Sequence, residues 1–237
     1  MDAGTVTLDT RDGPMAVWSA RPDGTPRGAV VVVQEAFGVN DYIRDVTRRF
    51  AEEGYHAVAP ACFHRAGGGT AAYDDFAAVI PLFEGLTDDG IVVDLDATLG
   101  HLHEVGFDDA AIGIVGFCFG GRITFLAALE WALGAAVGFY GGGIVTPRFP
   151  QFPALVDRAD TLQTPWLGLF GDEDGSIPVE DVEALRTALA AAPIATEIVR
   201  YPEAEHGFHC HQRDSHHREA AEDAWRRTLA WLDRHLG

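Results

Sequence analysis

A cysteine flanked by glycines marks the point where an apolar segment, Ile112–Phe117, runs directly into an amphipathic one. Gly116 and Gly120 stand two residues before and two after Cys118. A strand and a helix can therefore pass close together and force the cysteine into a tight turn, with its side chain exposed above the sheet. The pattern is typical of a nucleophile elbow, with sulfur where a serine usually stands. A buried cysteine packing as a small hydrophobe is the alternative, and the strand before and helix after favour the nucleophile.

Candidates for an acid and a base follow Cys118 in the order nucleophile, acid, histidine that a triad on an α/β sheet requires. The acid falls in the turn Gly171–Pro178, directly after an apolar strand. The spacing does not choose among the three acids in this turn: Asp172, Glu173 and Asp174. His206 follows the strand Thr196–Tyr201 and precedes a C-terminal helix. In that position it is the candidate general base.

A further acid, Glu35, comes just after the run Ala29–Val33, which is almost wholly apolar. Such a run is typical of a strand buried on both faces of a parallel sheet. Its carboxyl end lies at the edge where open α/β sheets carry their sites. A carboxylate in so apolar a place costs free energy unless it is paired. We therefore expect a functional partner for Glu35.

Apolar and amphipathic segments alternate along the whole chain. The short runs Thr5–Leu8 and Met15–Ser19 suit an antiparallel edge hairpin. Core strands are expected near Ala29–Val33, Tyr55–Ala59, Ala111–Phe117, Ala135–Tyr140, Trp166–Phe170 and Thr196–Tyr201. Helices are expected near Tyr42–Glu53, Tyr73–Phe83, Gly90–Glu104, Phe119–Leu133, Val179–Ala191 and His216–His235. This alternation, without repeats or linkers, predicts a single domain over residues 1–237 of the α/β class, with a mostly parallel sheet and helices on both faces.

Together these motifs resemble the dienelactone hydrolase family, also called carboxymethylenebutenolidases, of the α/β-hydrolase superfamily. The resemblance covers nearly the whole sequence. Its specific parts are Gln34–Gly38, Gly116–Gly121, Gly171–Pro178 and Ala204–Phe208. It implies the α/β-hydrolase fold and the hydrolysis of an ester or lactone of a small organic molecule.

The resemblance also implies a role for each candidate residue. Asp174 is implied as the acid, because the family's acid stands three residues after the glycine of its turn and four before the proline. Glu35 would hold the resting thiol, and substrate binding would release the carboxylate so that it, or the histidine, takes the thiol proton. The N–H groups of Phe119 and Ala36 would form the oxyanion hole, and the place of Phe119 at a helix N-terminus suits that role.

The sequence departs from the family at the residues that would bind the substrate. Enzymes of the family bind a substrate carboxylate with two arginines. One stands four residues after the histidine, and the other lies in the helical segment after the third core strand. Cys210 occupies the first position here, and Ala71–Phe76 holds no arginine. Because losing a bidentate donor pair is not conservative, we expect an uncharged substrate. Arg65 is the candidate replacement, and His64 and Tyr140 are further candidate contacts to the substrate.

Composition limits the partners of the protein. The formal net charge is −19 and the chain has no lysine, so nucleic acid and anionic membranes would be repelled and Schiff-base chemistry is excluded. There is no long apolar span, and the first residues lack the pattern of a signal peptide. We therefore expect a cytoplasmic protein that acts on a small molecule without a cofactor. The sequence indicates no oligomeric state.

Histidine and cysteine are dense near the C-terminus, which raises the question of a metal site. The residues concerned are His206, His209, Cys210, His211, His216 and His217. Their spacing matches no tight ligand pattern, and the three cysteines of the chain show no paired spacing. Neither a metal site nor a disulfide is expected.

The sequence thus predicts a hydrolase in which Cys118 attacks a carbonyl, His206 transfers protons, Asp174 orients the imidazole and Glu35 controls the thiol. Two alternatives stay open. Thioester cleavage is one, since a cysteine and an oxyanion hole do not distinguish the leaving group. A non-catalytic member of the fold that binds a small ligand is the other, and the complete set of residues in the right order argues against it.

Overall fold

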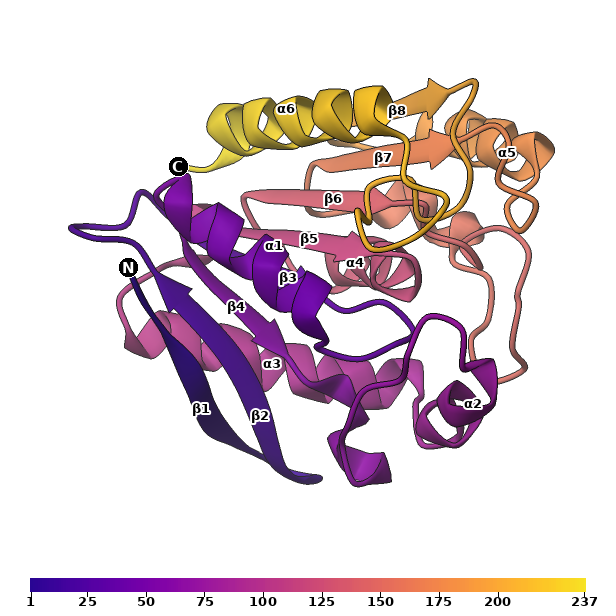
Figure 1. Cartoon of the computed structure of the whole chain (residues 1–237). Helices are drawn as coiled ribbons and strands as arrows, with labels where there is room; N and C mark the ends of the chain where they lie inside the picture. Colours follow the sequence, from indigo (N-terminus) through magenta and orange to yellow (C-terminus); the bar gives the residue numbers. More distant parts are fainter.

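The chain folds around one eight-stranded sheet, which the computed structural model of residues 1–237 describes in full (Figure 1). From edge to edge the strands are β1 (Asp2–Thr10), β2 (Gly13–Arg21), β4 (His56–Pro60), β3 (Ala29–Val33), β5 (Ile112–Phe117), β6 (Ala135–Phe139), β7 (Trp166–Gly171) and β8 (Thr196–Tyr201). β1 and β2 pair antiparallel, and so do β2 and β4, whereas all other neighbours are parallel. The predicted class and the predicted edge hairpin are confirmed.

Helices cover both faces of this sheet (Figure 1). They are α1 (Asp41–Glu52), α2 (Phe76–Glu84), α3 (Asp88–Glu104), α4 (Phe119–Glu130), α5 (Val179–Leu189) and α6 (Arg218–His235), with short 3-10 helices η1 (Cys62–Ala66), η2 (Asp109–Ala111) and η3 (Val156–Thr161). On one face α1 and α6 meet through the rings of Phe50 and Trp225, whose centroids are 4.6 Å apart. On the other face α4 packs on β5 and β6 and contacts α3.

The centre of the sheet forms the core. Every residue of the strands from β3 to β7 is buried, which explains why their sequences are almost continuously apolar. A continuous cluster of 65 buried residues joins these strands to the helices on both faces. The edge strand β1 is mostly exposed. The buried strands therefore give the residues that follow them a rigid support.

One helix begins later than its sequence pattern predicts. The predicted start was Tyr73, whereas α2 begins at Phe76, because the side chain of Asp75 accepts a hydrogen bond from the N–H of Ala78 and caps the helix there. Tyr73 is left in the preceding loop, where its side chain is free to reach the interior. The hairpin strands β1 and β2 are longer than predicted, and the other boundaries shift by a few residues.

The carboxyl ends of the parallel strands bring distant segments together. The loops that follow β3, β5, β7 and β8 meet at one edge of the sheet, on the right in Figure 1, and α2 stands beside them. This is the edge at which open α/β sheets carry their sites. None of the helices combines the length and the apolar sequence needed to cross a bilayer.

Candidate active site

Cys118 lies in a strained turn between β5 and α4. Its backbone dihedrals are φ 54° and ψ −114°, a conformation that residues other than glycine rarely adopt. The flanking glycines are required by close backbone approach. A Cβ on Gly116 would collide with the carbonyl of Gly120, and one on Gly120 would collide with the carbonyl of Val33. The turn is therefore held by packing of β3, β5 and α4, and it presents the half-buried thiol to a cavity.

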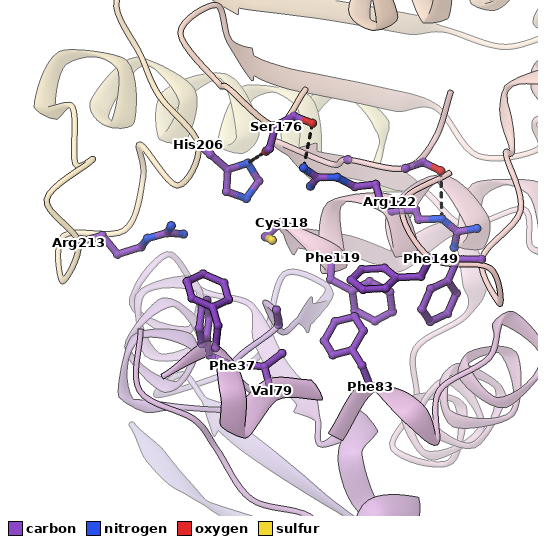
Figure 2. A pocket seen from close by; sticks show the side chains of 16 residues that line it. Phe37, Val79, Phe83, Cys118, Phe119, Arg122, Phe149, Ser176, His206 and Arg213 are labelled. Atoms are coloured by element: carbon purple, nitrogen blue, oxygen red, sulfur yellow. Dashed lines mark hydrogen bonds between the residues drawn. The ribbon is translucent and has the colours of Figure 1, made fainter. Parts of the chain in front are cut away.

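The imidazole of His206 lies above this thiol in Figure 2, and it is hydrogen-bonded to Asp174. His206 Nδ1 and Asp174 Oδ2 are 2.6 Å apart. The other carboxylate oxygen accepts hydrogen bonds from the N–H groups of Ser176 (2.8 Å) and Ile177 (3.2 Å) and from the Ser176 hydroxyl (2.5 Å). The structure thus places Asp174 on the histidine. Its neighbour Asp172 pairs instead with Arg200, at 2.6 Å.

These contacts set the protonation of the pair. Burial raises the pKa of Asp174, but its hydrogen bonds from His206 and Ser176 outweigh that effect and lower it. Burial likewise lowers the pKa of His206, whereas the negative charge of a Cys118 thiolate and the hydrogen bond to Asp174 raise it, to about 10 overall. The raised pKa makes His206 a base that is able to take the proton of the Cys118 thiol.

Two backbone N–H groups lie at the cavity beside the thiol. Phe119 is the first residue of α4, so its N–H has no acceptor within the helix, and the N–H of Ala36 makes no backbone hydrogen bond. Val33 and Gly116 are register partners, which brings the ends of β3 and β5 side by side. Ala36 and Phe119 both line the cavity. Both N–H groups are thus without a backbone acceptor next to the cavity that contains Cys118.

Glu35 is wholly buried next to this site. The Tyr73 hydroxyl donates a hydrogen bond of 2.8 Å to Oε2, and Arg213 Nη1 lies 3.8 Å from Oε1, which has no hydrogen-bond partner. Burial raises the pKa of Glu35, and Arg213, Tyr73 and His206 oppose that rise. The sequence implied that Glu35 holds the thiol. In this structure the carboxylate bonds to Tyr73, and the thiol faces His206.

Tyr73 is the centre of a small polar network around Glu35. Besides donating to the carboxylate, its hydroxyl accepts hydrogen bonds from Asn40 Nδ2 at 3.1 Å and from Cys210 Sγ at 3.3 Å. The guanidinium of Arg213 lies over the Tyr73 ring, 5.4 Å from its centroid. Tyr73 thereby fixes both charged groups of this end of the cavity. Burial and the nearby Glu35 raise the pKa of Tyr73, so the hydroxyl keeps its proton.

The cavity in front of Cys118 has a volume of about 370 Å³. It is lined by Ala36, Phe37, Phe76, Val79, Phe83, Cys118, Phe119, Arg122, Gly142, Gly143, Arg148, Phe149, Phe152, Ser176, His206 and Arg213. In Figure 2, Cys118 lies between Arg213 on one side and Phe83, Phe119 and Phe149 on the other. The site therefore has a charged end and an aromatic end, with the thiol between them.

Comparison with known proteins identifies the family of this chain. The model of the dienelactone hydrolase family matches residues 15–236. The chain belongs to the dienelactone hydrolase family. A protein of Escherichia coli (strain K12), provisionally named a carboxymethylenebutenolidase, is 42% identical over 99% of this chain and 88% of its own. The carboxymethylenebutenolidase of Rhodococcus opacus is 30% identical over 94% of this chain and 87% of its own.

A solved relative of the family shares the fold. The crystal structure of a protein from Klebsiella pneumoniae subsp. pneumoniae MGH 78578, provisionally described as a dienelactone hydrolase, is 41% identical and superposes with a TM-score of 0.89. The match covers 98% of each chain. The α/β-hydrolase fold predicted from the sequence is thereby confirmed.

Two of the predicted substrate contacts lie away from the cavity of this family member. Arg65 donates to Asp94 at 2.8 Å and to Asp12 at 2.9 Å, and His64 Nε2 lies 2.9 Å from Asp94. Asp94 is wholly buried in α3, so it needs both partners. The expectation that Arg65 and His64 meet the substrate is therefore corrected. Tyr140 is also buried and does not line the cavity, and its ring packs edge-on against that of His206, 5.1 Å away.

Three arginines that the sequence did not single out line the cavity: Arg122, Arg148 and Arg213. Cys210 stands where the family has an arginine, but its thiol is buried and turned toward Tyr73. Arg213, three residues further along the same loop, lines the cavity instead. The expectation of an uncharged substrate rested on two missing arginines, and Arg213 supplies a cation in place of one of them, so part of that ground is removed. The position of Arg213 at the cavity could not be predicted, because an irregular loop has no sequence periodicity that shows which side chains face inward.

Ser176 was also missed, although its position two residues after Asp174 in a turn is a signal for a side chain that bonds back to the carboxylate. The tail histidines do not gather. His209, for example, lies 2.6 Å from the Tyr42 hydroxyl in the interior. No group of three or more histidine, cysteine, aspartate or glutamate residues is placed to hold a metal ion.

Proposed function

We propose that this chain hydrolyses a carboxylic ester or lactone of a small molecule by covalent catalysis through Cys118. One observation carries the proposal: a thiol in a strained elbow faces an imidazole that is held by a buried carboxylate, beside two N–H donors. The name of the R. opacus relative, a carboxymethylenebutenolidase, refers to lactone hydrolysis and supports the same reaction class. No step of this chemistry needs a cofactor.

In the first half-reaction the Cys118 thiolate attacks the carbonyl carbon and forms a C–S bond. The carbonyl oxygen becomes an oxyanion, which the N–H groups of Ala36 and Phe119 stabilise. When this intermediate collapses, the bond to the leaving oxygen breaks and the His206 imidazolium gives its proton to that oxygen. The alcohol leaves, or in a lactone the ring opens, and the acyl group remains on sulfur.

In the second half-reaction neutral His206 takes a proton from a water molecule, whose oxygen attacks the acyl carbon. Collapse breaks the C–S bond, releases the carboxylic acid and restores the thiolate beside an imidazolium. Asp174 keeps the ring in the tautomer and orientation that both transfers need. Glu35 controls the thiol through its buried charge, which opposes a thiolate by like-charge repulsion.

The proposal is tested with the purified protein and a panel of aryl esters, enol lactones and acyl thioesters. Wild type is expected to hydrolyse at least one ester or lactone, and a rapid quench followed by mass spectrometry should show the acyl group on Cys118. Cys118→Ala should abolish turnover with little change in the thermal midpoint, since it removes a nucleophile and little volume. Cys62→Ala is the matched control, because Cys62 is buried in η1 and does not line the cavity.

Two results would contradict the proposal. Turnover by Cys118→Ala at an appreciable fraction of the wild-type rate would exclude Cys118 as the nucleophile. Hydrolysis confined to thioesters would replace the ester and lactone assignment with the thioesterase alternative.

A further inference from the structure

The aromatic end of the cavity is unusually rich in one residue type. Six of the 14 phenylalanines of the chain line this single cavity: Phe37, Phe76, Phe83, Phe119, Phe149 and Phe152. They come from the loop after β3, from α2, from the start of α4 and from the loop that follows β6. Four of them, Phe37, Phe83, Phe119 and Phe152, are buried in the core cluster, whereas Phe76 and Phe149 are exposed, so the aromatic core opens directly onto the cavity.

Four of these rings form a connected wall. Phe83 lies 4.8 Å from Phe119 and 5.4 Å from Phe149, and Phe119 lies 5.1 Å from Phe152, measured between ring centroids. The rings are tilted against one another rather than closed into a flat stack, so their faces and edges remain available to a further ring. We call Phe83, Phe119, Phe149 and Phe152 the phenylalanine wall.

The rim beside the phenylalanine wall is apolar as well. Five large apolar side chains of the chain are exposed, and three of them are Phe76 (62%) and Ile80 (62%) of α2 and Phe149 (46%). Two of these, Phe76 and Phe149, also line the cavity. Exposed apolar groups that gather at the mouth of a cavity, rather than singly over the surface, mark a place where an apolar ligand enters.

The guanidinium of Arg122, beside the phenylalanine wall, is not available to a ligand. Arg122 lines this end, but its guanidinium is fully engaged by both oxygens of Asp88, at 2.6 and 2.9 Å, and by the carbonyls of Gly143 and Pro153. The arginine is 2% exposed and lies 5.2 Å from the Phe152 ring. It therefore supports the wall and holds the neighbouring loop, and the donor left near the wall is Arg148, which lines the cavity and donates to the Ser176 carbonyl at 2.9 Å.

We propose that the substrates carry a bulky aromatic substituent that packs on the phenylalanine wall while their carbonyl lies at Cys118. This inference rests on the proposed ester or lactone hydrolysis and names the class of substrate for it. The carbonyl of an ester has an acyl substituent on one side and an alkoxy substituent on the other. Only one of the two can point toward the wall. The other points toward Arg213 and Tyr73. The volume of about 370 Å³ falls in the range of sites that enclose ligands larger than a simple lactone.

The test compares small esters that differ only in an aromatic ring on one side or the other. Hydrolysis of methyl acetate, methyl phenylacetate and benzyl acetate is followed by proton release, and each kcat/KM is divided by the rate constant for hydroxide hydrolysis of the same ester. We expect one of the two aromatic esters to exceed methyl acetate by about 10- to 100-fold, the effect of burying one ring side chain. Which of them gains tells which side of the carbonyl faces the wall.

Variants then locate the effect. Phe83→Ala, which removes the central ring of the wall, should lower the ratio of the aromatic ester to methyl acetate about tenfold. Phe149→Ser tests the same wall at an exposed position and serves if Phe83→Ala does not fold. Phe107→Ala is the matched control, because Phe107 packs near His56, on the far side of the chain's core, and does not line the cavity. Its ratio should equal that of wild type.

The outcomes separate this inference from the function on which it rests. Equal corrected rates for all three esters, or an aromatic preference that survives both Phe83→Ala and Phe149→Ser, would overturn the inference while leaving ester hydrolysis intact. No hydrolysis of any ester or lactone and no acylation of Cys118 would overturn the proposed function, and the inference with it.

Discussion

Replacing Glu35 by glutamine should make the protein more stable at neutral pH and less able to control its thiol. The carboxylate is wholly buried, and burial raises its pKa above the ordinary value of 4.5. A group whose folded pKa is raised contributes stability below its unfolded pKa, and that contribution is lost as the pH rises through the folded pKa. Wild type is therefore penalised above that pH, whereas the neutral amide is not.

The magnitude follows from the contacts of Glu35. Each unit of pKa rise corresponds to about 1.4 kcal/mol of stability lost once the carboxylate is ionised. Glutamine keeps an oxygen that can accept the 2.8 Å hydrogen bond from Tyr73, and it loses only a 3.8 Å approach to the partly exposed Arg213. We expect Glu35→Gln to raise the free energy of unfolding by about 1–2 kcal/mol at pH 8, or the Tm by roughly 2–8 °C for a chain of this size.

Urea unfolding of wild type and Glu35→Gln at several pH values between 4 and 8.5 measures this difference. The gain should be largest at pH 8 and vanish near pH 4, where both side chains are neutral. Glu52→Gln, which changes an exposed carboxylate of α1, is the control and should show no such pH dependence. A glutamine variant that is less stable at pH 8, or a difference that does not change with pH, would refute the reasoning.

The remaining predictions concern the neighbours of Glu35 and His206. Tyr73→Phe removes the hydrogen bond to the ionised carboxylate and should cost about 1.5–3 kcal/mol at pH 8 but less near pH 4, measured by the same unfolding series. Asp174→Asn should lower kcat/KM about 10²- to 10⁴-fold. Because Asp174 helps to raise the pKa of His206 to about 10, the same variant should move the alkaline limb of the pH–rate profile to lower pH, and an unmoved limb would contradict that cause. In Glu35→Gln, alkylation of Cys118 by iodoacetamide should become faster, and an unchanged rate and turnover would leave Glu35 with a structural role only.

The parts of the molecule that the sequence predicts well are those built from short-range patterns. The strands β3 to β7 are continuous apolar runs, and the elbow at Cys118 is a local spacing of glycines, so both are visible without any tertiary information. The places of His206 and of the acidic turn depend only on chain order and on the rule that parallel strands end at one edge. That rule leaves Asp172, Glu173 and Asp174 open, and the family resemblance was needed to single out Asp174.

The misplaced residues depend on long-range pairing. Arg65 was expected at the substrate, but a buried aspartate 29 residues away in α3 binds it. Tyr73 was placed in a helix, and a capping aspartate leaves it in the loop, where it meets Glu35 across 38 residues of sequence. Neither partner can be read from local spacing, because an ion pair or a hydrogen bond between side chains leaves no period in the sequence.

The two sides of the cavity are built from different parts of the fold, and this separates the substrate preference of the enzyme from its catalytic residues. The groups that perform the attack follow parallel strands of the sheet, whereas much of the aromatic wall comes from α2 and from the loop near Phe149, which lie outside the sheet. Arg122 fastens that loop through backbone carbonyls, which any sequence supplies. New side chains on these two segments can therefore alter which ester is accepted while the reacting centre is inherited unchanged. Grafting them between relatives is a direct route to new substrate ranges on one scaffold.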